Sequence, residues 1–463
     1  MGRPGAGHGR GHLRRTIRPA LRTLDRQLGL GAAVAFVVGE VIGVGIFLTP
    51  AEMIRGLASP GLTLAVWLAV GAAAWCGALC YGELAARWPE AGGGYVYLRE
   101  AWGEEVAFLY GWKSLLVMDP GLTAALAAGF AQYAAYLAPL EAGAQKATGI
   151  LAIVLMASAN LLGARLGARV LLGLTASKLL LLAVIVTWGF ASGRGDLGHF
   201  VPFLARQPGA EPLVAGLAGG IVGAFFAFGG FWDVAKIGGE VRDPERNLPR
   251  ALTLGVAITT LTYVLTTGVF VYLVPFDAAA SGEAFAAHVG RALFGAAGGE
   301  VFAAVVALAV LGSLAAVLMG APRVYHAMAR DGVFPRALGA VHPRLGTPAR
   351  AIALQAALGC LLLAVGTFGA IVAYFVFVTV AFIALTVAGL YRLPRPASGY
   401  RVPGYPWTPA GFLALLGTLL VLLAAGRPAQ AALGTLVVAL GVPVYRLLVA
   451  SRPAPLDEPA REA

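Results

Sequence analysis

Long apolar segments follow one another along almost the whole chain. Between clusters of arginine, proline and glycine we find twelve of them, each close to or above the about 20 residues that an α-helix needs to cross a bilayer. The third is longer than one crossing requires, so we expect it to tilt or to extend past the bilayer. The pattern predicts an all-α polytopic membrane protein with twelve transmembrane helices. The segments lie near 28–50, 61–85, 104–137, 148–164, 170–191, 213–240, 249–275, 299–322, 349–367, 369–391, 408–425 and 429–450.

Composition supports a membrane protein. The 463 residues are 59% hydrophobic and 12% charged, with a mean hydropathy of +0.79. A soluble domain averages about 45–50% apolar and about 25% charged residues. Disordered, collagen-like and coiled-coil chains are not rich in leucine, alanine, valine and phenylalanine at once, so those classes are excluded as well.

Charge sets the expected orientation. The net charge is +11, but the basic residues form short caps between apolar segments, so nucleic-acid binding is not expected. The connections on the side of the N-terminus hold 25 Lys and Arg residues, and those on the opposite side hold 6. By the positive-inside rule both termini are cytoplasmic, with a basic tail at 1–27 and a second cytoplasmic tail at 451–463. The excess of arginine, alanine and glycine is typical of a high-GC prokaryote, so we expect a multi-pass protein of the cell (inner) membrane.

Two predicted helices contain glycine-rich interruptions at matching places. The first segment includes Gly39, Gly43 and Gly45 in GEVIGVGIF, and the sixth includes Gly229 and Gly230 in FAFGGFWD. Glycine lowers the cost of leaving helical geometry, and a broken helix is tolerated in lipid only where it lines a cavity. Paired interruptions of this kind indicate a transporter site at the bilayer midplane. Close packing of small residues is the alternative interpretation of either cluster alone.

An unwound turn in each helix would expose backbone groups of both signs. Half-helix N-termini favour a carboxylate and exposed carbonyls favour an ammonium, so an α-amino acid satisfies both. Phe226 and Phe228 could cover this pocket as a gate, although core packing is the commoner role of a phenylalanine. The groups expected at the site are the amides of Val44, Gly45 and Ile46 and the carbonyls around Ile42 and residues 226–228.

Charged residues inside predicted spans need an explanation, because each costs about 2.5–3.5 kcal/mol on insertion scales. Lys178 is interpreted either as a fixed ammonium inside the bundle or as a lysine that snorkels to the headgroups. Glu40 is either a proton-coupling group or the counter-charge of Lys178. Asp233 and Lys236 are three residues apart and can neutralise one another. The full set is Glu40, Lys113, Asp119, Lys178, Asp233 and Lys236.

Several motifs resemble those of the amino acid–polyamine–organocation (APC) superfamily, and more closely those of the L-amino-acid transporter family. The resemblance covers roughly residues 28–450. The motifs are GVGIFLTPAEM (Gly43–Met53), SPGLTLAVW (Ser59–Trp67), GALCYGELAARWPEAGGGYVYLREAWG (Gly77–Gly103), FLYGWKSLLV (Phe108–Val117), FAFGGFWDVAKIGGEVRDPERNLPRAL (Phe226–Leu252) and LGSLAAVLMGAPRVYHAMARDGVFP (Leu311–Pro335).

The resemblance implies one transporter domain at 28–450 that works by alternating access. It would contain a five-plus-five inverted repeat with discontinuous helices 1 and 6, of which repeat one is 28–191 and repeat two is 213–391. Two helices at 408–450 would be added to the repeats. Sodium-independent transport or exchange of amino acids is implied as well.

The resemblance also assigns residues by position. It implies that Lys178 is the family's span-five lysine, which holds the first broken helix through carbonyls around Gly39 and Ile42, and that Ser313 closes the same locus. Such an ammonium could occupy the place of a sodium ion in ion-coupled relatives. Phe226 would be the gating aromatic. The implied substrate residues are Ile42, Gly43, Val44 and Gly45 on the carboxylate side and Phe226, Ala227 and Gly229 on the amino side.

The chain departs from the family pattern at positions that bear on substrate choice. Val44 stands where a serine is usual, and Phe228 and Phe231 stand where tyrosine and tryptophan are usual. Glu40 and Asp233 are also unusual. Animal members pair with a glycoprotein through a cysteine between spans three and four, but residues 137–148 contain no cysteine, so no disulfide-linked heavy chain is expected.

Other functions remain as alternatives. A cationic amino acid or polyamine carrier is the first, because Glu40, Asp119 and Asp233 could form an acidic centre. A proton-coupled symporter is the second. No HExxH, GxSxG or GxxxxGK motif is present, so we expect no enzyme, cofactor or metal. Sensors and channels are less favoured, since the tails are short and paired broken helices suit one occluded site. The cysteines, which we expect to form no disulfide, are Cys76, Cys80 and Cys360.

Overall fold

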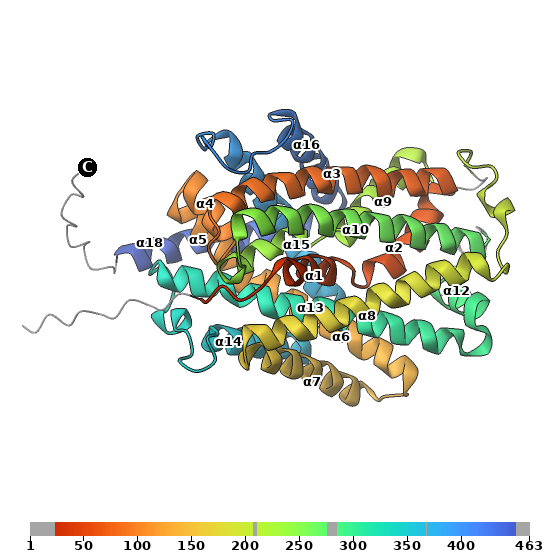
Figure 1. Ribbon diagram of the computed structural model, residues 1–463, viewed down its shortest axis with the longest axis horizontal. Coiled ribbons are helices and arrows are strands. Elements are labelled where there is room, and N and C mark those ends of the chain that lie inside the picture. The colour runs from red at the N-terminus through yellow and green to blue at the C-terminus, as the bar shows by residue number, and fades with distance from the viewer. Residues whose placement is uncertain (1–23, 207–210, 276–284, 367, 451–463) are drawn as a thin grey trace, which may run out of the picture.

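The computed structural model describes residues 24–206, 211–275, 285–366 and 368–450, which form an elongated bundle of helices (Figure 1). These residues contain no β-strand, and an isolated β-bridge joins Leu28 to Val241. The predicted all-α class is therefore confirmed. Apart from positions 24–27, the predicted tails at 1–27 and 451–463 lie outside the described residues.

Nine helical segments of the described chain are long and apolar enough to cross a membrane, and a bent pair makes ten. The predicted segments at 349–367 and 369–391 contain shorter apolar helices, Ala349–Val365 (α14) and Val376–Tyr391 (in α15 and η6), so the count of twelve crossings stays a prediction. The nine are α3 (Pro60–Arg87), α5 to α6 (Glu104–Leu137), α7 (Ala142–Leu161), α8 (Ala164–Ala191), α9 with η3 (Leu213–Glu240), α10 (Pro244–Leu273), α12 to α13 (Val289–Arg330), α16 (Trp407–Gly426) and α17 to α18 (Pro428–Leu448).

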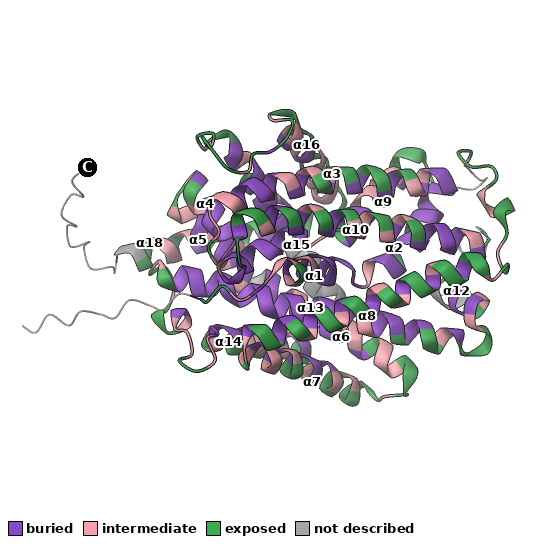
Figure 2. Cartoon of the chain, viewed as in Figure 1, coloured by how far each residue is buried: buried purple, intermediate pink, exposed green. Residues whose placement is uncertain are grey.

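The surface of the bundle is apolar and its interior holds charge. Figure 2 shows exposed positions along the outer faces of α7 and α8, and large apolar side chains such as Leu155, Leu180 and Trp188 are among them. Lipid tails solvate such side chains, whereas water would not. All six charged residues noted within the spans are buried, which is the distribution expected of a protein whose interior carries its polar function.

The over-long third segment contains a π-helical turn. It begins as α5 (Glu104–Lys113), passes through η1 (Ser114–Met118) and continues as α6 (Asp119–Leu137). Pro120 lies in the first turn of α6, where a missing backbone N–H is tolerated. Single π-helical turns are frequent at functional sites, and this one separates the buried charges of Lys113 and Asp119.

Both predicted interruptions are present. The first span consists of α1 (Leu30–Val41) and α2 (Gly45–Leu57), which meet at an angle of 44° across residues 42–44. In the sixth span α9 (Leu213–Ala227) ends in a turn at 228–230, and the chain continues as the 3₁₀-helix η3 (Phe231–Glu240). Gly230 has φ of +105°, a conformation that glycine adopts without strain. Figure 1 shows α1 and α2 in the middle of the bundle, between α10 and α8.

The two broken spans pack against each other on both sides of the breaks. On one side α2 packs on α9 so closely that a Cβ on Gly216 would lie 2.3 Å from the carbonyl oxygen of Gly56. On the other side the backbone N–H of Arg242 donates to the carbonyl of Leu28 at 2.8 Å. The breaks are therefore enclosed between two tightly packed ends.

Candidate functional site

The carbonyls at the end of α1 are held by a buried lysine. Nζ of Lys178, on α8, lies 2.8 Å from the carbonyl oxygen of Gly39, 2.6 Å from that of Ile42 and 2.9 Å from that of Ala309. The side chain is 0% exposed, so it does not snorkel. A helix that stops inside lipid leaves carbonyls without partners, and here one ammonium satisfies carbonyls of α1, of the break and of α13 (Gly298–Arg330).

Ser313, also on α13, contacts the same turn of α1. Its hydroxyl oxygen lies 3.0 Å from the carbonyl oxygen of Gly39 and 2.9 Å from that of Glu40. The close approach of Ser313 to the first break requires glycine there, because a Cβ on Gly43 would lie 2.9 Å from the Ser313 hydroxyl. A Cβ on Gly39 would lie 2.5 Å from the hydroxyl of Thr175 on α8. The structure thus brings together Lys178, Ser313 and Gly39, which the family resemblance implied lie at one locus.

Tyr263 on α10, which no sequence motif predicted as a site residue, joins the two breaks. Its hydroxyl lies 2.9 Å from the carbonyl oxygen of Val41 and 2.7 Å from that of Ala227, the last residues of α1 and α9. The ring packs 4.9 Å from that of Trp67 and 5.2 Å from that of Phe228, between centroids. A tyrosine within the apolar seventh segment was the available signal, since a buried tyrosine hydroxyl usually has a partner.

Backbone amides at the start of α2 have no partner. In the part of the chain that the structure describes, the amides of Val44, Gly45 and Ile46 donate no hydrogen bond, whereas that of Phe47 donates to the carbonyl of Val44. Free amides at a helix N-terminus form an anion site. The C-terminal end of α9 crosses beside them, because a Cβ on Gly45 would lie 3.0 Å from Cα of Ala227.

The aromatic residues of the second break differ in exposure. Phe228 is 1% exposed and packs on Trp67, so its environment is that of a core residue. Phe226 is 41% exposed, and its ring lies 6.2 Å from that of Phe225. The carbonyl of Phe226 accepts a hydrogen bond from the amide of Gly229 at 3.0 Å. Of the two predicted gate residues, Phe226 is therefore the one whose side chain is not packed in the core.

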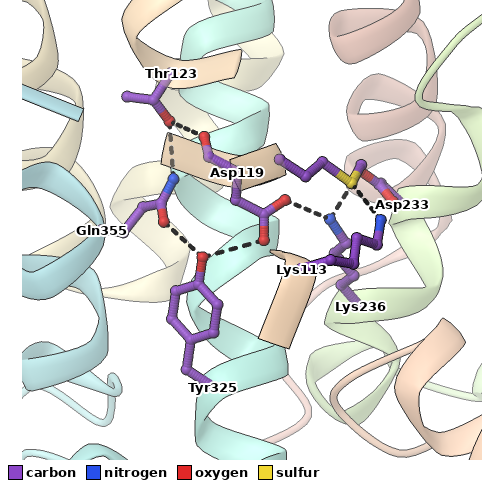
Figure 3. Close-up of polar contacts among 8 residues, drawn as sticks. Lys113, Asp119, Thr123, Asp233, Lys236, Tyr325 and Gln355 are labelled. Carbon is purple, nitrogen blue, oxygen red and sulfur yellow. Dashed lines mark hydrogen bonds and ion pairs between the residues drawn. The ribbon is translucent and has the colours of Figure 1, made fainter. Parts of the chain in front are cut away.

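Five buried charged residues form a central charge cluster, which we define as Glu40, Lys113, Asp119, Asp233 and Lys236. Nζ of Lys236 lies 2.9 Å from Oδ2 of Asp233 and 3.3 Å from Oδ1 of Asp119 (Figure 3). The predicted pairing of Asp233 with Lys236 is confirmed, and Asp119 from α6 joins it. Nζ of Lys113 lies 2.8 Å from the sulfur of Met118 and 4.8 Å from the centroid of the Tyr110 ring.

Hydrogen bonds extend from the cluster toward α14. The hydroxyl of Tyr325 lies 3.1 Å from Oδ2 of Asp119 and 2.7 Å from Oε1 of Gln355 (Figure 3). Nε2 of Gln355 donates to the hydroxyl of Thr123 at 2.9 Å. No sequence motif predicted these residues, because polar side chains distributed over α6, α13 and α14 carry no local spacing that relates them.

Glu40 differs from the other members of the cluster. It is 7% exposed, and neither carboxylate oxygen has a hydrogen-bond partner among the described residues. Its side chain faces the second break, since a Cβ on Gly230 would lie 2.8 Å from its Cγ. Asp233 is its leading electrostatic neighbour. Lys178 contacts carbonyls instead, so the interpretation of Glu40 as the counter-charge of Lys178 is wrong.

No metal site accompanies these groups in the described ranges, because they contain no set of three His, Cys, Asp or Glu residues that could hold an ion. The cysteines at 76, 80 and 360 carry free thiols. What the site offers is therefore backbone amides, backbone carbonyls, one fixed ammonium and the charge cluster.

Comparisons of the sequence with known proteins identify its family. Residues 28–445 match the family model described as amino acid permease. The chain is 29% identical over 433 residues to the serine/threonine exchanger SteT of Bacillus subtilis (strain 168), a match that covers 91% of this chain and 96% of the relative. It is 30% identical over 434 residues to the human large neutral amino acids transporter small subunit 2, a match that covers 92% of this chain and 80% of the relative. It is 30% identical over 380 residues to the rabbit (Oryctolagus cuniculus) b(0,+)-type amino acid transporter 1, and this match covers 80% of this chain and 77% of the relative.

Proposed function

Because the chain belongs to the amino acid permease family, we propose that it carries L-amino acids across the membrane by alternating access around the two broken spans. The observation that carries the proposal is the row of unbonded amides at Val44, Gly45 and Ile46, next to the C-terminal end of α9. A substrate carboxylate fits the amides, and its amino group fits the carbonyls around the breaks. The proposed substrate residues are Ile42, Gly43, Val44, Gly45, Ile46, Phe226, Ala227, Phe228 and Gly229.

We propose that transport does not need sodium. The ammonium of Lys178 already contacts three carbonyls around the first break, and a second cation there would meet like charge without free ligands. Because these carbonyls belong to α1, the break and α13, the lysine can couple the position of α1 to the rest of the bundle. Gly39 and Ser313 complete this coupling locus.

A neutral substrate is favoured over a cationic one. An acidic centre was the basis of the cationic amino acid and polyamine alternatives, but Asp119 and Asp233 both contact Lys236. Two of the three carboxylates therefore already have a cation. Two of the relatives, a serine/threonine exchanger and a large neutral amino acids transporter, support the same preference.

We also propose the organisation that the family resemblance implies. Repeat one spans 28–191 and repeat two spans 213–391, with added helices at 408–450. The matching positions of the breaks, after α1 and after α9, support this division. The cell (inner) membrane is the proposed location, with both termini cytoplasmic and no disulfide-linked heavy chain.

Counterflow in liposomes tests the function. Purified protein is reconstituted into vesicles loaded with an unlabelled neutral amino acid such as serine or leucine, and the labelled compound is added outside in a buffer free of sodium. We expect transient accumulation of label above the level in vesicles without internal amino acid. Failure across a panel of neutral amino acids would contradict the proposal, and accumulation only after sodium is added would contradict sodium independence alone.

A further inference from the structure

We propose that Glu40 and Asp233 form a proton-binding site, and that net uptake of an amino acid carries a proton with it. The inference deepens the proposed function and rests on it. The site is built from both broken spans, since Glu40 is near the end of α1 and Asp233 follows the turn at 228–230. Its ligand is a proton rather than a metal ion, because the described residues contain no set of three His, Cys, Asp or Glu residues that could hold an ion.

The carboxylate of Glu40 lacks the partners that a buried anion requires. Both of its oxygens are without a hydrogen bond among the described residues, and so is Oδ1 of Asp233. Glu40 is 7% exposed and Asp233 is 3% exposed. Burying an unpaired charge is so costly that such a group neutralises instead. A proton on one of these carboxyls removes one charge and supplies a donor for the other.

The number of charges in the central charge cluster also indicates one bound proton. Three acidic residues are present with two lysines, so the fully ionised cluster has an excess of one negative charge. Lys236 contacts Asp119 and Asp233, and Lys113 interacts electrostatically with Asp119. Glu40 has no ion-pair contact of its own in the described structure. One bound proton makes the five residues neutral.

Beyond Lys236, which is paired with Asp119 and Asp233, no cation among the described residues is an electrostatic neighbour of Glu40. Asp233, Lys236 and Asp119 are its electrostatic neighbours on η3 and α6, and Tyr110 on α5 also faces the cluster. On the other side of α1, the ammonium of Lys178 is directed to backbone carbonyls. The remaining charged or titratable groups that face the cluster are Lys113 on α5, Tyr81 on α3 and Tyr325 on α13.

The position of the site explains how the proton and the substrate are coupled. Glu40 is two residues before the break at 42–44, and its Cγ packs against the turn at Gly230. Movement of one broken span relative to the other changes the distance between Glu40 and Asp233 and the access of water to both. A proton taken up from water on one side binds a carboxylate oxygen, and it is released to water on the other side when the two carboxyls separate.

The experiment compares net uptake with exchange. Vesicles that contain a pH-sensitive dye and no amino acid are placed in a more acidic medium, with the membrane potential clamped, and labelled neutral amino acid is added. We expect the wild-type protein to accumulate label and to acidify the lumen beyond the rate without substrate. Counterflow between equal pH values is measured in parallel, because exchange moves protons equally in both directions.

The variant Glu40→Gln keeps the shape of the side chain and removes its proton chemistry. We expect it to retain counterflow and to lose both the accumulation driven by the pH difference and the acidification. Glu52→Gln is the matched control, since Glu52 is an exposed carboxylate on α2, and it should behave as wild type. If Glu40→Gln lacks counterflow, Glu40→Asp should restore counterflow and acidification together.

The outcomes separate this inference from the proposed function. Absence of counterflow in the wild type would overturn amino acid transport itself. Counterflow without acidification in the wild type, or acidification that persists in Glu40→Gln, would overturn the proton site alone. Loss of counterflow in Glu40→Gln for arginine or a polyamine, with neutral counterflow intact, would identify Glu40 as a ligand of a cationic substrate and would also overturn the proton site.

Discussion

A helix that breaks inside lipid releases backbone carbonyls that water cannot reach, and single side chains satisfy them in this protein. Lys178 and Ser313 contact the carbonyls of α1, and Tyr263 contacts the last carbonyls of α1 and α9. Each side chain comes from a helix other than the broken ones. The breaks are therefore held by three helices, α8, α10 and α13, that surround them.

At this scale the first prediction concerns Lys178. In Lys178→Ala we expect transport to fall to the level of protein-free vesicles, because three carbonyls lose a charged donor whose hydrogen bonds contribute about 1.5–3 kcal/mol each. Counterflow measures the loss, and the melting temperature in detergent measures any decrease in stability.

Lys146→Ala is the matched control. Lys146 also donates to a backbone carbonyl, that of Ala364 at 2.9 Å, but it does so at an exposed position far from the breaks in sequence. It should transport as wild type. Wild-type turnover in Lys178→Ala would contradict the coupling role. It would mean that the ammonium of Lys178 in the wild-type protein has a structural role only.

At the level of helix packing, the crossing of α2 and α9 depends on small residues. Gly45 approaches the backbone of Ala227, and Gly56 approaches that of Gly216, so the two half-helices touch at two levels. Close approach of this kind is typical of helix pairs in membranes that pack through glycine. It also holds the free amides of α2 next to the end of α9.

The second prediction tests this crossing. We expect Gly45→Val to abolish counterflow and to lower the melting temperature, because its Cβ would lie 3.0 Å from both Cα and Cβ of Ala227 and overpacking costs about 1–3 kcal/mol. Gly31→Val is the control, since a Cβ at Gly31 on α1 meets nothing within 4 Å. Equal activity of the two variants would show that the crossing is not required for transport.

Elements were more predictable than the contacts between them. Apolar length and glycine placement predicted the helices and both breaks, because these features depend on local sequence. The pairing of Asp233 with Lys236 was predictable from their spacing of three residues. The hydrogen bond of Tyr263 to Val41 joins residues 222 positions apart, and no local pattern specifies such a partner. The π-helical turn was missed for a related reason, since the residues at 114–118 form an ordinary apolar run.

In the whole molecule, the arrangement of the connections follows their charge. Figure 1 shows α4 (Gly94–Trp102) and α18 (Gly441–Ala450) at one end of the bundle and α12 (Phe285–Phe294) at the other. The connections between helices lie alternately at these two ends. Those on the side of the N-terminus hold 25 Lys and Arg residues, and those on the opposite side hold 6. The end that carries α4 and α18 is therefore the expected cytoplasmic end.

The third prediction tests this orientation with fusions in a bacterial host. Green fluorescent protein joined after residue 450 should fluoresce, and alkaline phosphatase at the same position should be inactive, because the first folds in the cytoplasm and the second outside it. Alkaline phosphatase inserted at 138–142, between α6 and α7, should be active, since that connection lies on the opposite side. Reversed signals at both positions would place the basic connections outside and invert the proposed topology. An active phosphatase at both positions would mean an even number of crossings between them, which contradicts the nine crossings that the predicted topology places there.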